Sequence, residues 1–259
     1  MSINIKPFFV SANVHNSHNY IRDLRSRCFA DQENKAKETN LDLVGGFVLE
    51  PIGPNRKMGK LANCKSESEP HCVSKNIMKV QNLARIHRIE SHHPMENEKK
   101  LLVLDLDLTL ISGSHKERPF LHQFLTHTYQ HYNLVLWSDS MMYRIRRILK
   151  KLKMHRHEDY KFSFYMCCNS VVYVQKGRRE KKCKPLELIW RQFPAWGPHN
   201  SIIIDDMARN FLMNPQSGLE IEKFRGGEDD TLPQLAKYLE KIAGMDNFST
   251  LNHNEWQNV

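Results

Sequence analysis

Polar residues suited to acid–base, metal or phosphate chemistry end several apolar runs of this 259-residue sequence. LLVLDLDLT carries two aspartates and a threonine, LVLWS ends on a serine, SIIIDD ends on two aspartates, and a lysine opens KPLELIW. Singly, each has an ordinary structural explanation, since acids occur in turns, serines cap helices and lone lysines are usually solvated. Together they form one ordered set, whose members are Asp105, Asp107, Thr109, Ser138, Lys184, Asp205 and Asp206.

This set contains the parts that phosphoryl transfer requires. Such a reaction needs a nucleophile, an acid or base, donors for the equatorial phosphoryl oxygens, and cations that offset the developing charge. Clustered carboxylates repel one another, and a hard divalent cation held by carboxylates and water relieves that repulsion. Mg²⁺ suits such a site best, so the residue types predict a magnesium-dependent phosphoryl-transfer site.

The stretches around these residues alternate between strand-like and helix-like patterns. Apolar runs of strand length, separated by helices, are typical of a parallel sheet covered on both faces. We therefore expect an α/β fold with a Rossmann-like parallel sheet and helices on both faces. Ligands of such sheets bind at the carboxyl ends of the strands, where the polar set lies. The predicted strands are 101–106, 133–139, 160–167, 171–175 and 199–206, and the predicted helices are 76–90, 120–132, 141–152, 184–193 and 231–243.

Two of these helices carry boundary signals. Pro119 precedes the helix at 120–132 and suits its first turn. The helix at 231–243 has Thr231 as a candidate cap, Pro233 in its first turn and Gly244 after its end.

The N-terminal part of the sequence has a weaker pattern. Residues 1–75 mix isolated apolar residues with turn formers and charges, which predicts an atypical or loosely ordered region with some strand character at 43–53. Residues 76–100 should form a helix and a linker leading into a main domain at 101–259.

We find no run suited to a membrane helix and no signal peptide, so we expect no membrane association. The scattered cysteines favour a reducing compartment.

DLDLT resembles the DxDxT motif of the haloacid dehalogenase phosphatases. More narrowly, the chain is similar over 76–259 to the ubiquitin-like-domain-containing C-terminal-domain phosphatases, which are close to the small phosphatases of the RNA polymerase II C-terminal domain. The stretches that carry this resemblance are RPFLHQFL, LVLWSDS, CKPLELIW, DDMARNFLMNPQSGL and LNHNEW. The resemblance implies an FCP-like phosphatase domain at 101–259 that uses Mg²⁺.

The resemblance also implies roles for the two aspartates of the first motif. Asp105 matches the nucleophile, which attacks phosphorus and forms an aspartyl-phosphate. Asp107 matches the general acid that protonates the leaving oxygen and then the base that activates water, and its backbone carbonyl matches a metal ligand. Arg209 and Asn210 match the family pattern without an assigned chemistry.

The remaining positions match residues that bind or orient. Thr109 is expected to orient the loop and the acid/base, and Ser138 and Lys184 to hold the transferring phosphoryl oxygens. Asp105, Asp107 and Asp206 match the metal ligands, and Asp205 is expected to support Asp206.

Motif spacing bears on the substrate. Between Asp105 and Ser138 there is room for a loop and a helix, and between Ser138 and Lys184 for a helix and a small β insertion, so we expect no cap domain. Without a lid, the substrate itself must exclude water, which favours phosphoserine or phosphothreonine on a protein. The expected function is a magnesium-dependent protein serine/threonine phosphatase. The RNA polymerase II C-terminal domain and proteasome-associated phosphoproteins are the candidate substrates that the resemblance implies.

The net positive charge of the sequence bears on its expected partners. The sequence has 38 lysines and arginines against 29 acids, a net charge of +9, which suits a polyanionic partner. The basic stretch 174–184 could dock an acidic or phosphorylated segment, form a solvated strand and loop, or act as a nuclear import signal. We expect a phosphoprotein partner, no direct nucleic-acid binding, a monomer, and a nuclear location with the cytoplasm as the alternative.

Three departures from the resembling family favour a second hypothesis. The loop at 110–118 is shorter than in close relatives, Asp139 stands where relatives carry alanine, and 1–75 does not resemble ubiquitin. These features leave open a catalytically weak or inactive phosphatase-fold module that binds phosphoproteins. The expected absence of a cap counts against a third reading, a small-molecule phosphatase.

Overall fold

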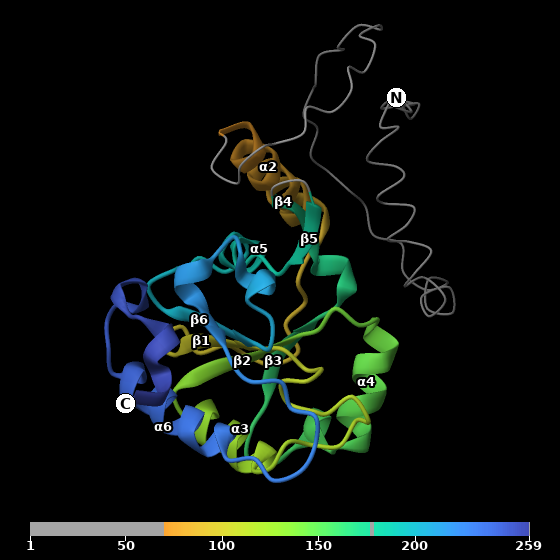
Figure 1. The fold of residues 1–259 in the computed structure, drawn as a ribbon, viewed down its shortest axis with the longest axis vertical. Helices are drawn as coiled ribbons and strands as arrows, with labels where there is room; N and C mark the ends of the chain where they lie inside the picture. The colour runs from red at the N-terminus through yellow and green to blue at the C-terminus, as the bar shows by residue number, and fades with distance from the viewer. Residues whose placement is uncertain (1–69, 177–178, 259) are drawn as a thin grey trace, which may run out of the picture. The chain divides into compact units, whose positions relative to one another are not determined.

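Five parallel strands form the central sheet in the order β3-β2-β1-β6-β7 (Figure 1). The computed structural model describes residues 70–176 and 179–258. β1 is the middle strand, and its Val103 pairs with Val135 on one side and Ile203 on the other. The expected α/β class with a parallel sheet is confirmed. The strands are β1 (Lys100–Leu104), β2 (Tyr132–Trp137), β3 (Phe162–Met166), β6 (Ser201–Asp205) and β7 (Gly218–Glu220).

Both faces of the sheet are covered. Successive side chains of a strand point to opposite faces, so Leu102 and Leu104 of β1 enter one core cluster, while Leu101 and Val103 enter the other. All four are fully buried, and burying each contributes about 1.5–3 kcal/mol. The first face carries α3 (Leu121–Tyr129), α4 (Met142–Lys151) and α6 (Thr231–Ala243), and the second carries α5 (Glu187–Trp190), α2 (Pro70–Ile86) and the hairpin of β4 (Val172–Lys176) and β5 (Arg179–Cys183).

The order of the strands reverses beside β1. Along the chain, the sheet first grows from β1 through β2 to β3, and then resumes on the other side of β1 with β6 and β7. Such a switch point leaves a crevice outside the carboxyl ends of the two central strands. Asp105 directly follows β1, and Asp205 is the last residue of β6, so the topology brings both to that crevice.

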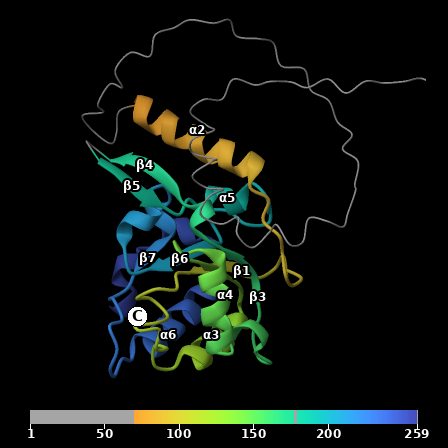
Figure 2. The same ribbon diagram turned by 90° about the vertical axis from the view of Figure 1, so that its right-hand side faces the viewer.

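The β4–β5 hairpin is the small β insertion expected from the sequence. It lies between the sheet and α2 (Figure 2), where Lys79 Nζ donates to the Tyr173 carbonyl at 2.7 Å and Gln175 N donates to Asn76 Oδ1 at 3.2 Å. Within the described residues, the chain between β1 and β2 holds one loop and α3, and the chain between β2 and β6 holds no larger insertion than this hairpin. The expected capless architecture is confirmed.

Several element boundaries differ from those predicted. α2 begins at Pro70 and ends at Ile86, against a predicted 76–90, and α5 covers four residues of the predicted 184–193. β7, only three residues long, was not predicted. Short 3-10 helices fill the connections: η2 (Met154–Arg156), η3 (Cys168–Ser170), η4 (Ala208–Phe211), η5 (Pro215–Ser217), η6 (Phe248–Thr250) and η7 (His253–Asn258).

α6 has the predicted bounds but a different cap. Thr231 is its first residue, and the side chain that accepts from the Thr231 N–H is Asp229, with Oδ1 at 3.0 Å. Pro119 likewise lies outside α3, because the intervening Phe120 adopts a left-handed conformation, with φ of 64°, before the helix begins. The Thr231 cap and the first-turn Pro119 were therefore wrong.

The predictions for 1–69, including the strand at 43–53, fall outside the described residues. In the part of the chain that the structure describes, no helix has the length and apolar character needed to span a membrane.

Candidate active site

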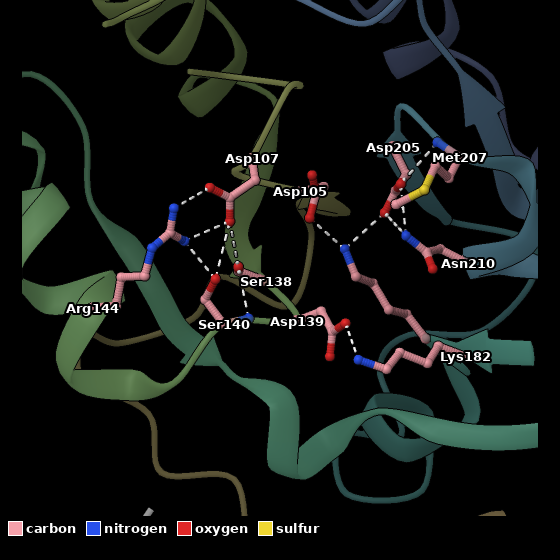
Figure 3. A network of polar contacts seen from close by, with 11 residues as sticks. Asp105, Asp107, Ser138, Asp139, Ser140, Arg144, Lys182, Asp205, Met207 and Asn210 are labelled. Carbon is pink, nitrogen blue, oxygen red and sulfur yellow. Dashed lines mark hydrogen bonds and ion pairs between the residues drawn. The ribbon is translucent and has the colours of Figure 1, made fainter. Parts of the chain in front are cut away.

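A tight turn after β1 separates the two aspartates of the first motif. Asp105 N still donates to the Ile204 carbonyl at 3.0 Å, so Asp105 keeps the register of the sheet. The chain then turns through Leu108, which has a φ of 62°, and the N–H groups of Leu110 and Ile111 both donate to the Leu106 carbonyl at 3.0 Å. As Figure 3 shows, Asp105 lies between a network around Asp107 and a network around Asp205.

Lys184 joins the two central strands. Its buried ammonium donates to Asp105 Oδ1 at 2.5 Å and to Asp205 Oδ2 at 2.7 Å, and its backbone N–H donates to the Asn210 carbonyl at 2.6 Å. Burial would lower the pKa of Lys184, but the charges of Asp105 and Asp205 outweigh it and raise that pKa. Lys184 is therefore a fixed positive charge beside Asp105.

Asp105 has little contact with water. Burial is the main cause that raises the pKa of Asp105, Asp205 and Asp206 add to it, and the charge of Lys184 opposes it. Removal of solvent and the proximity of other acids both disfavour an unpaired carboxylate. A second cation at this point would stabilise the ionised form that a nucleophile needs.

Asp205 has its acceptor positions occupied. Besides Lys184, it accepts from Asn210 Nδ2 at 2.8 Å on each oxygen and from Met207 N at 3.0 Å. Asn210 thus holds Asp205 through its side chain and Lys184 through its carbonyl. Because its oxygens are already bonded, Asp205 orients its neighbours and is poorly placed to coordinate a metal directly.

Asp206 has the opposite environment. Both of its carboxylate oxygens are buried and have no hydrogen-bond partner among the described residues, and Lys223 Nζ lies 3.5 Å from Oδ2. Burial and the charge of Asp205 raise the pKa of Asp206. A buried carboxylate without donors costs free energy unless a cation satisfies it.

These acids fit a hard divalent cation. One carboxylate oxygen from each of Asp105, Asp205 and Asp206 lies within 4.8 Å of the other two, and the oxygens of Asp206 accept no hydrogen bond from the described residues. Oxygen-only donors of this kind suit Mg²⁺ or Ca²⁺ better than softer metals.

Asp107 is held by four donor groups, which come from the connection after β2 and from α4. Arg144 Nη2 donates to Oδ1 at 2.7 Å and Arg144 Nη1 to Oδ2 at 2.8 Å, while the hydroxyls of Ser138 and Ser140 donate to Oδ2 at 3.1 Å (Figure 3). Partial burial raises the pKa of Asp107, but the hydrogen bonds and charge of Arg144, with the two serines, outweigh it and lower that pKa. In this arrangement the carboxyl group is ionised.

Thr109 and Arg118 anchor the base of the loop. The Thr109 hydroxyl is buried, with no hydrogen-bond partner within the described ranges, and its carbonyl accepts from Arg118 Nη1 at 3.0 Å. Arg118 also donates to both oxygens of Asp229, from Nε and Nη2, at 2.8 Å each. Thr109 therefore supports the loop through its backbone.

Asp139 does not present a free negative charge to the site. Lys182 Nζ donates to Asp139 Oδ2 at 2.6 Å, and both side chains are less than half exposed. A cation of β5 therefore offsets the negative charge that Asp139 adds beside the site.

The structure brings all seven predicted site residues to one edge of the sheet, and it adds partners that sequence reasoning missed. Arg144, Ser140 and His115 complete the network on Asp107, where His115 Nε2 lies 2.8 Å from Arg144 Nη2. Arg144 lies in the first turn of α4, and the signal that could have found it is its place in a helix that starts beside a strand end. Asn210 was noted without a role.

The comparisons with known proteins show the family of this chain. A family model described as NLI interacting factor-like phosphatase matches residues 100–249, more than half of the chain. The chain therefore belongs to the NLI interacting factor-like phosphatase family, and the resemblance to the C-terminal-domain phosphatases is confirmed.

Curated relatives make the likeness more specific. Ubiquitin-like domain-containing CTD phosphatase 1 of Xenopus tropicalis is 37% identical over 196 residues, which is 70% of this chain and 62% of the relative. The Drosophila melanogaster protein of the same name is 37% identical over 210 residues, 76% of this chain and 65% of the relative. The chain thus spans less than two thirds of the length of these relatives.

A solved structure of Fcp1, an essential RNA polymerase II CTD phosphatase, aligns with 65% of this chain and 53% of its own. The identity is 14% and the TM-score 0.35, a likeness too loose to compare individual residues.

Proposed function

We propose that this chain is a magnesium-dependent protein serine/threonine phosphatase that works through an aspartyl-phosphate on Asp105. The observation that carries the proposal is the position of Asp105, held by the Lys184 ammonium and lying beside the unpartnered carboxylate of Asp206. A nucleophile between a fixed cation and carboxylates that can hold a divalent metal is the arrangement that phosphoryl transfer requires.

Asp105 is the group that attacks. Its Oδ1 accepts from Lys184, while Oδ2 has no hydrogen bond from any described residue and is free to approach phosphorus. Attack forms the bond between Asp105 and phosphorus, and the bond from phosphorus to the serine or threonine oxygen breaks. Lys184 balances the negative charge beside the transferring group throughout.

Asp107 handles the proton in both steps. As an acid, it donates a proton to the leaving serine or threonine oxygen. As a base, it then takes a proton from the water that attacks the aspartyl-phosphate, which releases inorganic phosphate and regenerates Asp105. To take up a proton, the Asp107 carboxylate must give up part of its paired contact with Arg144. Ser138, which donates to Asp107 at 3.1 Å, lies where its hydroxyl can turn toward a phosphoryl oxygen.

Mg²⁺ would be held by Asp105, the backbone carbonyl of Asp107 and Asp206, with Asp205 in support, and when bound it offsets the negative charge of the phosphoryl group.

The substrate is proposed to be a phosphorylated protein segment. The site lies at an edge of the sheet over which the described residues place no cap domain, so a segment of another protein can reach it. The relatives named as CTD phosphatases support the RNA polymerase II C-terminal domain as a candidate substrate. Proteasome-associated phosphoproteins remain a second candidate, and a nuclear location and a monomeric state belong to the same proposal.

Replacing the nucleophile tests this assignment. Asp105→Asn should lower magnesium-dependent hydrolysis of an aryl phosphate at least about 1,000-fold, because removing a nucleophile costs about 4 kcal/mol or more of barrier. Asp246→Asn, the same change at an exposed position after α6, should keep full activity. Unchanged hydrolysis in Asp105→Asn would refute the assignment.

One observation favours a second function. The paired contact of Arg144 with Asp107 holds the proposed acid in its ionised form, which suits a phosphatase-fold module that binds phosphoproteins with weak or no turnover. Tight binding of a phosphoserine peptide, with no phosphate released in the presence of magnesium, would favour this module over the enzyme.

A further inference from the structure

The solvent-facing side of α4 carries cations that the proposed reaction does not use. Ile145, Ile148 and Leu149 of α4 face the core, so the charged residues gather on the opposite side of the helix. We call these charged residues the basic ridge. Its members are the exposed Arg146, Arg147, Lys150 and Lys151, and it begins next to Arg144, which is half-buried at the site.

The basic ridge has no acids of its own to neutralise it. The sequence has no aspartate or glutamate from 140 to 157, and the four exposed cations form no ion pair with any described residue. The positive charge of the ridge also acts on its surroundings. Burial is the main cause that lowers the pKa of His92, and the charge of Arg146 lowers it further. A concentration of like charge without partners destabilises a fold slightly and attracts anions.

Helix electrostatics explain only part of the ridge. Cations in the last turn, such as Lys150 and Lys151, interact favourably with the helix dipole, by about 0.3–1 kcal/mol each. Arg144 lies in the first turn, where the same dipole disfavours a cation, and that turn holds no acid. The first half of α4 therefore carries positive charge that does not stabilise the helix.

The hairpin makes a useful contrast. There, Lys182 pairs with Asp139 at 2.6 Å, and Glu180 pairs with Lys79 at 3.2 Å. Lys182 and Glu180 of the hairpin are thus paired within the protein, whereas the four exposed cations of α4 form no ion pair with any described residue.

The ridge starts at the site and leads away from it. Arg144, Arg147 and Lys151 follow one another along one side of the helix, over about 10 Å at about 1.5 Å per residue. About three residues of an extended peptide, at about 3.3 Å each, cover that distance. Since Arg144 touches Asp107, a peptide whose phosphate lies at Asp105 can place its next few residues along the ridge.

We propose that the basic ridge is a docking surface for a substrate segment that carries further negative charge, as carboxylates or additional phosphates, within about four residues of the phosphoresidue. This inference rests on the proposed function and adds the class of peptide that the site prefers. A peptide is favoured over nucleic acid because the ridge is short and ends at a site for single phosphoryl groups.

Matched charge reversals in the full chain test the proposal. The ridge variant is Arg147→Glu/Lys151→Glu, which leaves Arg144 in place. The control is Lys237→Glu/Lys241→Glu on α6. Each pair is exposed, four residues apart, with its second member in the last turn of its helix, so charge and helix effects match. The C-terminal half of α6, which carries both control lysines, packs near the start of β2, where Tyr132 Oη donates to the Leu239 carbonyl, so the two lysines lie toward the end of the sheet opposite the site.

The probes are two phosphoserine peptides, flanked by three glutamates or by three glutamines, together with an aryl phosphate. The unaltered chain should have a higher kcat/KM for the acidic peptide than for the glutamine peptide. In the ridge variant the ratio of these two kcat/KM values should fall about tenfold, and in the control it should not change. Loss in neither variant, or equal loss in both, would overturn the proposal.

Two further readouts separate this proposal from the proposed function. If the unaltered chain fails to hydrolyse the aryl phosphate, the enzyme assignment fails, and docking is then read from the Kd of the same two peptides by fluorescence anisotropy. A preference for the acidic peptide that only the ridge variant loses still supports docking. A single-stranded oligonucleotide serves as a further probe of the ridge. If the chain binds the oligonucleotide more tightly than the acidic peptide, and only the ridge variant loses that binding, the proposal that the ridge docks a peptide is overturned.

Discussion

At the scale of single residues, the two aspartates of the first motif differ in what surrounds them. Asp105 has a buried lysine and other acids as neighbours, while Asp107 has an arginine and two hydroxyl groups. One environment holds a nucleophile beside a fixed ammonium and other acids, and the other fixes the direction of a proton carrier. Two carboxylates in such different environments are suited to different tasks in one reaction.

Leaving-group dependence tests the role of Asp107. Asp107→Asn should lower kcat/KM for a phosphoserine peptide by about 100- to 10,000-fold, because the serine oxygen is a poor leaving group that needs a proton. Hydrolysis of an aryl phosphate should fall much less, because a phenolate leaves without protonation. Measuring both substrates with one variant supplies the internal control, and an equal loss on both would contradict the role of Asp107 as the acid.

At the scale of elements, β1 and β6 place the site, and the sequence predicted both because their apolar runs are long and end on acids. The same reasoning missed β7, since three residues are too few to show a pattern. It overestimated α5, where an amphipathic stretch continues beyond four helical residues as turns. Arg144 was missed because its partner Asp107 is distant in sequence, and only the packing of α4 onto the sheet brings the two together. Asn210 was noted, but its contacts with Asp205 and Lys184 follow from the turn after β6 and could not be assigned from the sequence.

The start of α6 offers a prediction about stability. Asp229 binds the buried Arg118 through both oxygens and accepts from the Thr231 N–H. Asp229→Ala should lower the free energy of unfolding by about 3 kcal/mol, because it leaves a buried guanidinium unpaired. Asp230→Ala, one residue on, should cost less than about 0.5 kcal/mol, since the Asp230 side chain accepts no hydrogen bond from the helix backbone and bonds only the exposed Gln234 side chain. Urea denaturation of both variants measures this, and equal losses would contradict the account.

His253 gives the contact between α6 and η7 a pH dependence. It is buried, with Nδ1 2.6 Å from Tyr238 Oη, and burial lowers its pKa to about 4. His253 is therefore neutral in the fold. Its contribution to the free energy of unfolding is complete above pH 6.5, the usual pKa of histidine, and is lost as the pH falls toward 4. That loss is about 3 kcal/mol.

Denaturation at pH 7 and pH 4.5 measures the effect. The drop in unfolding free energy should be smaller in His253→Gln than in the unaltered chain, because glutamine does not titrate. An identical drop in both proteins would show that His253 does not titrate on unfolding.

At the scale of the whole molecule, charge is distributed unevenly. The acids gather at the carboxyl edge of the sheet, where Asp105, Asp205 and Asp206 approach within 4.8 Å, while unpaired cations gather along α4. The sequence predicted the acid cluster from strand ends, but its net charge of +9 could not indicate which surface carries the excess. The helix period shows that α4 presents part of that excess on its exposed side.

Magnesium should stabilise the fold as well as support activity. A ligand that binds only the folded chain adds about 2.7 kcal/mol at 100 times its Kd, which is about 5–10 °C in Tm for a domain of this size. Asp206→Asn should abolish most of this shift, because Asp206 supplies the only carboxylate of the cluster with both oxygens unbonded to described residues. Thermal unfolding with magnesium and with chelator is the measurement, and an undiminished shift in Asp206→Asn would contradict the proposed ligand set.

The covalent intermediate is the most direct test of the central claim. Acid quenching during turnover of a radiolabelled phosphoserine peptide with magnesium, followed by peptide mapping, reveals which residue carries the phosphoryl group. The account predicts label on Asp105, released by hydroxylamine and missing from Asp105→Asn. Turnover by the unaltered chain with label on another residue, or full turnover by Asp105→Asn, would contradict it.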